Sequence, residues 1–144
     1  MKYISLNHNS APTSFKKAVI NGLAPDKGLY FPKNEVKLSA SFIESLKNID
    51  DFEICYEVIR KYIGDEIPKN KLLDIVKDTV SFKIPLKKIE KSIYSLELYH
   101  GPTLAFKDIG AKFMASCLNY FKDSYTSKKI TVLVATSGDT GGAV

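Results

Sequence analysis

The sequence predicts a mixed fold, in which a helix-rich α+β domain over residues 1–91 is followed by the start of a parallel α/β domain over residues 92–144. Three observations lead to this prediction. Apolar residues recur at helical spacing through the first part of the chain. Near Ser92 the pattern changes to the alternation of a strand. At the end of the sequence, an apolar run typical of a buried strand is followed by a glycine-rich turn, as in a βαβ unit.

The first part of the chain predicts four helices and one short strand. We expect helices over residues 12–21, 41–47, 51–63 and 69–80, with Ser14 capping the first, and Gly22 and Gly64 ending the first and third. Either Asp50 or Asp51 can cap the third helix. Residues 25–28 have the composition of a tight turn, and residues 29–31 predict a strand that ends at a proline.

The second part predicts a strand, a helix and a second strand. Residues 93–98 alternate as a strand does, and residues 99–108 form a loop that leads into a helix. The apolar stripe of this helix consists of Ile109, Phe113, Cys117, Tyr120 and Phe121. Residues 129–135 predict a buried strand, and a glycine-rich turn over residues 136–142 begins another helix.

Composition and charge exclude several classes of protein. The 21 basic and 16 acidic residues give a net charge of +5, but the lysines are spread along the chain, which favours a solvated surface over a nucleic-acid interface. No uncharged stretch approaches the roughly 20 residues of a membrane span, and the N-terminus lacks a signal-peptide run. Cys55 and Cys117 are too few for a disulfide framework or metal site and are expected to be buried thiols. We expect a soluble cytoplasmic protein.

The glycine-rich turn is a candidate anion site. Small residues directly after a strand and at the start of a helix allow backbone N–H groups to converge on a phosphate or carboxylate, and Ser137 and Thr140 add hydroxyl groups. A plain turn between a strand and a helix favours the same residue types. The turn is not a phosphate-binding loop of the Walker type, because no Gly-Lys-Ser/Thr follows.

Lys107 is the candidate nucleophile. It lies one residue before Asp108, a candidate N-cap, after a loop that contains Gly101 and Pro102. Apolar flanks predict a dry environment, in which desolvation and the helix start would lower the pKa of the amine from about 10.4 and free it to attack carbonyl groups. The alternative is an ordinary surface lysine, since most lysines are exposed.

His100 is a second candidate for chemistry. A histidine beside a turn can act as a general acid or base, or serve as a hydrogen-bonded structural residue. A serine, histidine and aspartate set can be written with Ser137 and Asp139, but the serine lacks the flanking glycines of a nucleophile elbow. No cluster of residues has the spacing of metal ligands.

Three segments resemble the threonine synthases, a family of pyridoxal-phosphate enzymes. Residues 96–108, LELYHGPTLAFKD, resemble the segment that carries the cofactor, with Lys107 at the position of its lysine. Residues 135–141, ATSGDTG, resemble the loop that grips the amino-acid end of the substrate. Residues 22–30, GLAPDKGLY, resemble the signature of the N-terminal domain of the bacterial and fungal type.

The resemblance implies a fold, a cofactor and a reaction. The α/β domain would be of the tryptophan synthase β-like type, and the cofactor would be pyridoxal 5'-phosphate, bound covalently by Lys107. The full-length enzyme would convert O-phospho-L-homoserine and water to L-threonine and phosphate by γ-elimination and β-addition. Once released from the cofactor, the amine of Lys107 would move protons at Cα and Cβ of the substrate.

The resemblance also implies the other residues of the site. Phe106 and Asp139 would border the cofactor, and the substrate would be held by Thr136, Ser137, Gly138, Asp139, Thr140, His100 and Thr103. The family has a second glycine-rich loop for the cofactor phosphate and a hydroxyl partner for the pyridine nitrogen, which these 144 residues do not include. We therefore expect the chain to be an N-terminal fragment that is inactive alone.

Two other functions remain open. One is a related enzyme of the serine and threonine dehydratase type, although those enzymes tend to have Ser-Phe-Lys and an Asn in the loop, where this chain has Ala105 and Asp139. The other is a non-catalytic module that binds an anion or nucleotide at residues 137–142. A third interpretation, in which the first 90 or so residues are an interaction domain that packs against the catalytic body, is compatible with the threonine synthase. The sequence does not indicate an oligomeric state.

Overall fold

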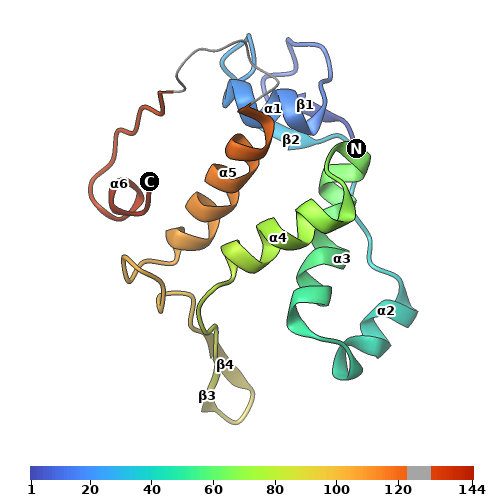
Figure 1. The fold of residues 1–144 in the computed structure, drawn as a ribbon, viewed down its shortest axis with the longest axis vertical. Helices are drawn as coiled ribbons and strands as arrows, with labels where there is room; N and C mark the ends of the chain where they lie inside the picture. The colour runs from blue at the N-terminus through green and yellow to red at the C-terminus, as the bar shows by residue number, and fades with distance from the viewer. Residues whose placement is uncertain (123–130) are drawn as a thin grey trace. The chain divides into compact units, whose positions relative to one another are not determined.

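The computed structural model describes residues 1–122 and 131–144, which form two compact units, Met1–Asp74 and Ile75–Val144 (Figure 1). The division falls within a helix, α4 (Lys69–Thr79). The mixture of helices and strands that the sequence predicts is confirmed. The domain boundary near residue 91 stays a prediction.

The first unit is mostly helical, with one small antiparallel sheet. Its strands pair Tyr3 with Pro32 and Ser5 with Tyr30. In chain order its elements are β1 (Tyr3–Ser5), α1 (Phe15–Asn21), β2 (Tyr30–Pro32), α2 (Ala40–Ser45), the short 3₁₀ helix η1 (Leu46–Asn48), α3 (Asp51–Ile63), the 3₁₀ helix η2 (Gly64–Glu66) and the start of α4.

The helix boundaries follow the capping residues. The hydroxyl of Ser14 accepts a hydrogen bond from the Lys17 amide at 3.2 Å, and the chain leaves α1 at Gly22 with φ of 67°. Asp50, rather than Asp51, caps α3 by accepting from the Phe52 amide at 2.8 Å. The four predicted helices of this part of the chain are therefore confirmed, with boundaries shifted by a few residues.

Long-range contacts join the two ends of the first unit. The hydroxyl of Tyr3 donates to the carbonyl of Tyr62 at 2.9 Å. The carboxylate of Glu66 accepts from the amides of Phe15 and Lys16 at 2.8 and 3.0 Å, which satisfies two of the free N–H groups at the start of α1. The core beneath these contacts includes Phe15, Ala18, Tyr56, Ile63, Ile67 and Leu72.

The turn predicted over residues 25–28 is confirmed and is organised by one carboxylate. Asp26 accepts from the Ser5 hydroxyl at 2.6 Å and from the amides of Asn9 and Gly28 at 2.9 and 3.0 Å. The hydrogen bond from Ser5 is the main cause that lowers the pKa of Asp26 below its ordinary value of 3.8. A side chain at position 28 would collide with Ser5, which explains the glycine.

The second unit contains the end of α4, the hairpin β3 (Leu86–Glu90) and β4 (Ile93–Leu96), α5 (Lys107–Phe121) and α6 (Asp139–Ala143). The hairpin is antiparallel and pairs Leu86 with Leu96. The predicted strand near residues 93–98 is thus β4, whereas β3 was not predicted, because its segment is dominated by charged residues. Cys117 and Phe121 of α5 are buried, together with Ala105.

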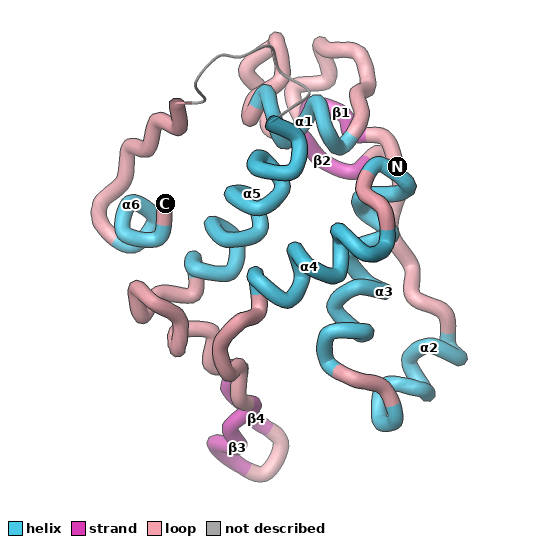
Figure 2. Tube along the Cα trace, in the orientation of Figure 1, coloured by secondary structure: helices cyan, strands magenta, loops and turns pink. Residues whose placement is uncertain are grey.

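The strand predicted over residues 129–135 is not formed at residues 131–135; residues 129 and 130 lie outside the described part. Residues 131–137 are drawn as loop in Figure 2 and are exposed, with Leu133 at 91%. The physical reason is pairing: a strand requires hydrogen-bonding neighbours, and none of the strands β1 to β4 pairs with residues 131–135. Both sheets among the described residues are antiparallel, so the predicted parallel βαβ pairing is not present there.

Candidate functional site

The loop that leads into α5 is held by a buried carboxylate. Asp108 is 3% exposed, and its two oxygens accept from Thr103, one from the hydroxyl at 2.6 Å and one from the amide at 3.0 Å. The prediction that Asp108 is the N-cap is wrong. The helix begins at Lys107, with Phe106 at the N-cap and no side-chain cap, because the carboxylate bonds backward to the loop.

Three other residues restrict the same loop. Gly101 is buried, and a Cβ there would collide with the Asp108 carboxylate and lie 2.8 Å from the Phe82 ring. Leu104 has a φ of 57°, in the left-handed region that a leucine seldom adopts, and its side chain is exposed. Ala105 is buried beside it. The backbone that precedes Lys107 is therefore fixed at several successive positions.

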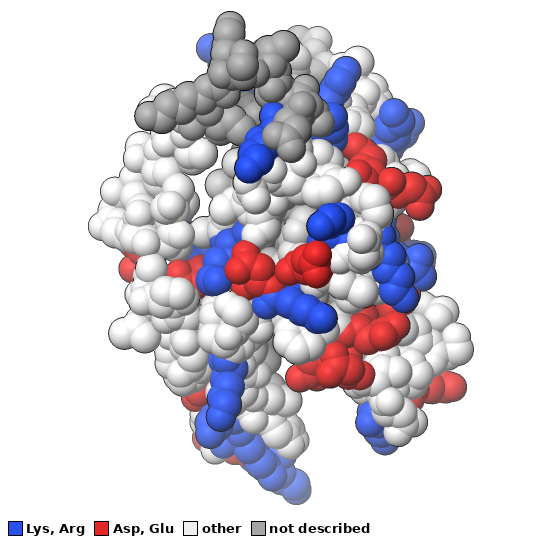
Figure 3. Space-filling model, viewed as in Figure 1, with Lys and Arg blue, Asp and Glu red and all other residues white. Residues whose placement is uncertain are grey.

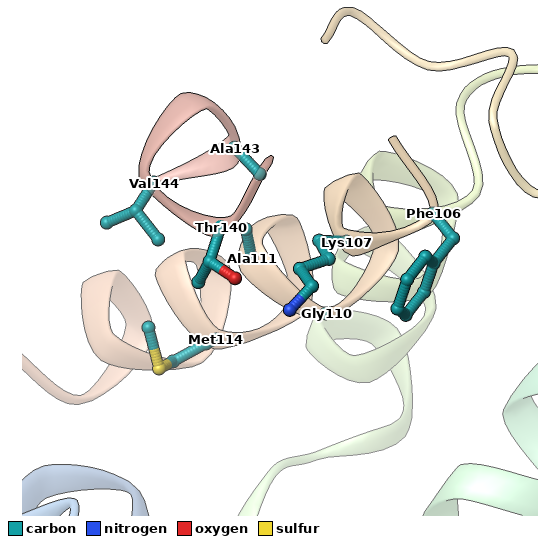
Figure 4. Close-up of a pocket in the computed structure, with 8 residues that line it drawn as sticks. All are labelled: Phe106, Lys107, Gly110, Ala111, Met114, Thr140, Ala143 and Val144. Atoms are coloured by element: carbon teal, nitrogen blue, oxygen red, sulfur yellow. The ribbon is translucent and has the colours of Figure 1, made fainter. Parts of the chain in front are cut away.

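Lys107 lines a cavity of about 350 Å³ (Figure 4). Lys107 itself is half-buried, and its Nζ lies 5.6 Å from the centre of the Phe106 ring. Figure 4 shows this amine between Phe106 on one side and Thr140 of α6 on the other. Apart from the Thr140 hydroxyl, the remaining walls are apolar or glycine: Gly110, Ala111, Met114, Ala143 and Val144.

The glycine-rich turn forms the start of α6, as predicted. Gly138 is the N-cap, with φ of 159°, and its amide donates to the hydroxyl of Thr136 at 3.2 Å. Thr140 reaches the cavity of Lys107. Thr136, Ser137, Gly138 and Asp139 are exposed at the beginning of the helix and, within the described part of the chain, are not among the residues that line this cavity.

His100 belongs to a separate cluster. Its Nε2 lies 2.8 Å from the Glu97 carboxylate, and its ring is 4.8 Å from the ring of Tyr99. The hydrogen bond with His100 is the main cause that lowers the pKa of Glu97, whereas partial burial and then the hydrogen bond with Glu97 raise the pKa of Tyr99. Of the predicted site residues, Lys107, Phe106 and Thr140 thus share one cavity, while His100 and Thr103 bond to Glu97 and Asp108.

On the face drawn in Figure 3, the charged side chains of the described residues do not form a single basic surface. Figure 3 shows Lys and Arg interspersed with Asp and Glu on the face in view. Within residues 1–122 and 131–144, no three His, Cys, Asp or Glu side chains are grouped as a metal site would require. None of the helices in the described ranges is long and apolar enough to cross a membrane. Both cysteines are free thiols.

The structure is thus that of a mixed α+β protein in which the amine of a lysine at the start of a helix lines a mainly apolar cavity. A family model described as the threonine synthase N terminus matches residues 2–80. The chain therefore belongs to the threonine synthase family through its N-terminal part.

Relatives with known names agree with this assignment. Threonine synthase of Escherichia coli K12 is 39% identical over all of this chain and 33% of its own length, and that of Haemophilus influenzae is 42% identical over the same shares. The chain thus spans about a third of the length of these relatives.

Solved structures give the same result. A crystal structure of threonine synthase from Escherichia coli has a TM-score of 0.89 and 38% identity, over 99% of this chain and 33% of that one. A structure of threonine synthase from Brucella melitensis, described as PLP-bound, has a TM-score of 0.81 and 32% identity, over 86% of this chain and 28% of that one.

Proposed function

We propose that this chain forms the N-terminal third of a threonine synthase that converts O-phospho-L-homoserine and water to L-threonine and phosphate. The proposed cofactor is pyridoxal 5'-phosphate. The observation that carries the proposal is that the Lys107 amine and the Thr140 hydroxyl line one cavity. The match to the family over residues 2–80 and the similarity to relatives over the whole chain support it.

The residues of the cavity fit the chemistry of this cofactor. A primary amine can add to the cofactor's aldehyde, and apolar side chains such as Ala111 and Met114 line the same cavity. The volume of about 350 Å³ is within the range of small-molecule sites. When bound, pyridoxal phosphate withdraws electrons from the substrate and makes its carbon-bound protons removable.

Each site residue then has a proposed role. Lys107 binds the cofactor and, when released, moves protons at Cα and Cβ of the substrate. The amides and hydroxyls of residues 136–140 receive the substrate carboxylate at the start of α6. Phe106 and Asp139 border the cofactor. For His100 and Thr103, which bond to Glu97 and Asp108, contact with the substrate stays a prediction.

The proposal extends to the arrangement and location of the protein. Residues 92–144 are proposed to open the cofactor-binding domain, after an N-terminal domain over residues 1–91. Two free thiols in the described chain are typical of a reducing compartment, so we propose that the enzyme is cytoplasmic.

The test uses the full-length protein, incubated with pyridoxal phosphate, reduced with borohydride and mapped by peptide mass spectrometry. We expect the label on Lys107, and we expect Lys107→Ala to remove it and to lower phosphate release from O-phospho-L-homoserine by roughly a thousandfold or more. Lys122→Ala, which changes an exposed lysine at the end of α5, is the control and should keep both label and rate.

Two results would contradict the proposal. If no covalent cofactor is trapped, the site is that of an anion-binding module instead. If the label appears but the protein produces a 2-oxo acid from L-threonine and releases no phosphate from O-phospho-L-homoserine, the enzyme is of the dehydratase type.

A further inference from the structure

We propose that Asp108 is a positioning residue for Lys107: through its two hydrogen bonds to Thr103, its buried carboxylate fixes the loop of residues 101–107 and the direction in which the amine enters the cavity. The inference rests on the proposed function, because it takes the Lys107 amine to be the reactive group.

The burial of Asp108 requires a physical explanation. A carboxylate that is 3% exposed has lost nearly all of its hydration, and this loss must be offset by hydrogen bonds. The Thr103 hydroxyl and amide supply two, at 2.6 and 3.0 Å, and the first turn of α5 adds the favourable end of the helix dipole. An apolar side chain would fill the space without this desolvation cost but would not hold Thr103.

The geometry of the helix links this carboxylate to the amine. Successive residues of an α-helix project about 100° apart, so Asp108 can face the loop while its neighbour Lys107 faces the cavity. Rotation of the first turn of α5 would move both side chains together. The bonds to Thr103 prevent that rotation, and the amine is directed toward the cavity that Thr140 also lines.

The loop between the two bonded residues has little freedom to absorb a change. Gly101 packs against the Asp108 carboxylate, Leu104 is held in a left-handed conformation and Ala105 is buried. The amide of Leu104 also donates to the carbonyl of Gly101 at 3.1 Å, which closes the turn. A lost bond at Thr103 therefore loosens the backbone immediately before Lys107, rather than a distant segment.

The variants for the test remove, weaken or restore the hydrogen bonds between Thr103 and Asp108. Thr103→Val keeps the shape of the side chain and removes the hydroxyl donor, and Thr103→Ser restores that donor. Asp108→Asn removes the charge and replaces the acceptor oxygen opposite the Thr103 hydroxyl by an NH₂ group, so that bond can form only with the hydroxyl as acceptor and both bonds lose their charge assistance. The control is Ser116→Ala, because the Ser116 hydroxyl also donates to a carboxylate, that of Asp78, at the same distance of 2.6 Å and on the same helix.

The first measurement is amide hydrogen exchange of residues 101–107 in the full-length, cofactor-free protein. We expect exchange to be faster by roughly tenfold or more in Thr103→Val and Asp108→Asn, and unchanged in Thr103→Ser and Ser116→Ala. This readout does not depend on catalysis. Unchanged protection in both variants would overturn the proposal.

The second measurement is steady-state kinetics of phosphate release with the same variants. A misdirected amine reduces the fraction of productive complexes, so we expect kcat to fall by roughly tenfold or more in Thr103→Val while KM changes by less than about threefold. Thr103→Ser should recover most of kcat. A merely structural role predicts instead that kcat falls in Thr103→Val only in proportion to a loss of thermal stability, and that Ser116→Ala, which loses a similar bond, lowers kcat to the same extent.

The outcomes separate this inference from the proposed function. If the wild-type protein traps no cofactor at Lys107 and releases no phosphate, the proposed function fails. If the wild-type protein does both, and Thr103→Val and Asp108→Asn retain its kcat and its exchange protection, the function stands and the role of Asp108 is refuted.

Discussion

At the scale of single residues, burial and hydrogen bonding decide how each side chain can react. Cys117 is 0% exposed, and burial raises the pKa of its thiol to about 12. Cys55 is half-buried, and burial followed by the charges of Asp51 and Asp50 raises the pKa of its thiol as well. The sequence predicts buried thiols at both positions, which is confirmed for Cys117 and only partly for Cys55.

We expect the two thiols to react at different rates. At neutral pH iodoacetamide should modify Cys55 slowly and Cys117 only after unfolding, because Cys117 lacks both access and thiolate. Mass spectrometry of peptides from native and denatured protein measures this. Rapid labelling of Cys117 in the native protein would contradict the described packing of α5.

Asp26 makes the stability of the first unit depend on pH. Its pKa is lowered in the folded chain, so its contribution to stability is present above the ordinary value of 3.8 and is lost as the pH falls through the lower, folded value. We expect Asp26→Asn to have a lower midpoint of urea unfolding than the wild type at neutral pH. The gap between the two midpoints should narrow progressively below pH 3.8. A gap independent of pH would show that the carboxylate charge does not hold the turn.

At the scale of elements, a carboxylate distant in sequence completes the start of α1. Glu66, at the end of η2, accepts from the amides of Phe15 and Lys16, so the cap joins segments about fifty residues apart. Ser14 alone satisfies a third amide, that of Lys17. The stability of α1 therefore depends on the end of α3 and on η2.

We predict that Glu66→Gln destabilises the protein by about 1–2 kcal/mol, since the neutral amide keeps one acceptor and loses the charge at the helix start. The free energy of unfolding from denaturant titration measures the change. Asp65→Asn, at the exposed neighbouring position, is the control and should change it by less than about 0.5 kcal/mol. Equal effects of the two variants would exclude the capping role.

Local signals explain which elements could be predicted from the sequence. The helices α3 and α4 have sustained apolar periodicity, and α3 has both a cap at Asp50 and a stop at Gly64, so their boundaries follow from neighbouring residues. The strand β3 was not predicted, because its segment is dominated by charged residues, although its partner β4 follows it directly. The strand β1 was not predicted, because its pairing partner lies elsewhere in the chain. For the same reason residues 131–135 have the composition of a strand without its structure.

The candidate site was predictable in part. The composition around Lys107 and the glycine-rich turn indicates an amine near a helix start, and Lys107 and Thr140 do line one cavity. The partner of Asp108 was not predictable, because an aspartate near a helix start most often caps it. Here the bond runs backward to Thr103, five residues earlier, and only the conformation of the loop decides this.

At the scale of the whole molecule, the chain spans about a third of the length of the threonine synthases to which it is similar. Part of its apolar surface is exposed. Leu133, at 91%, is the extreme case, and Val132 and Val134 lie beside it. A second hollow, of about 570 Å³, borders Val132, Val134 and Leu118 of α5. These side chains are what a neighbouring sheet strand would cover.

We predict that the 144-residue chain alone binds a hydrophobic dye and releases no measurable phosphate from O-phospho-L-homoserine. Dye fluorescence should fall in Leu133→Lys, because this change removes exposed apolar area. Asn34→Lys, which also adds one positive charge at an exposed position, is the control and should leave the fluorescence unchanged. Phosphate release by the isolated chain would refute the expectation that it is inactive alone.

The bond between Thr103 and Asp108 also has a consequence for comparing sequences. An aspartate buried without its threonine carries an uncompensated charge, and a threonine without its aspartate leaves a donor unpaired, so neither residue is expected to drift independently. A natural homologue that lacks the threonine or the aspartate should therefore lack both. A reconstructed ancestral sequence that contains only one of the two residues should misfold in this loop first.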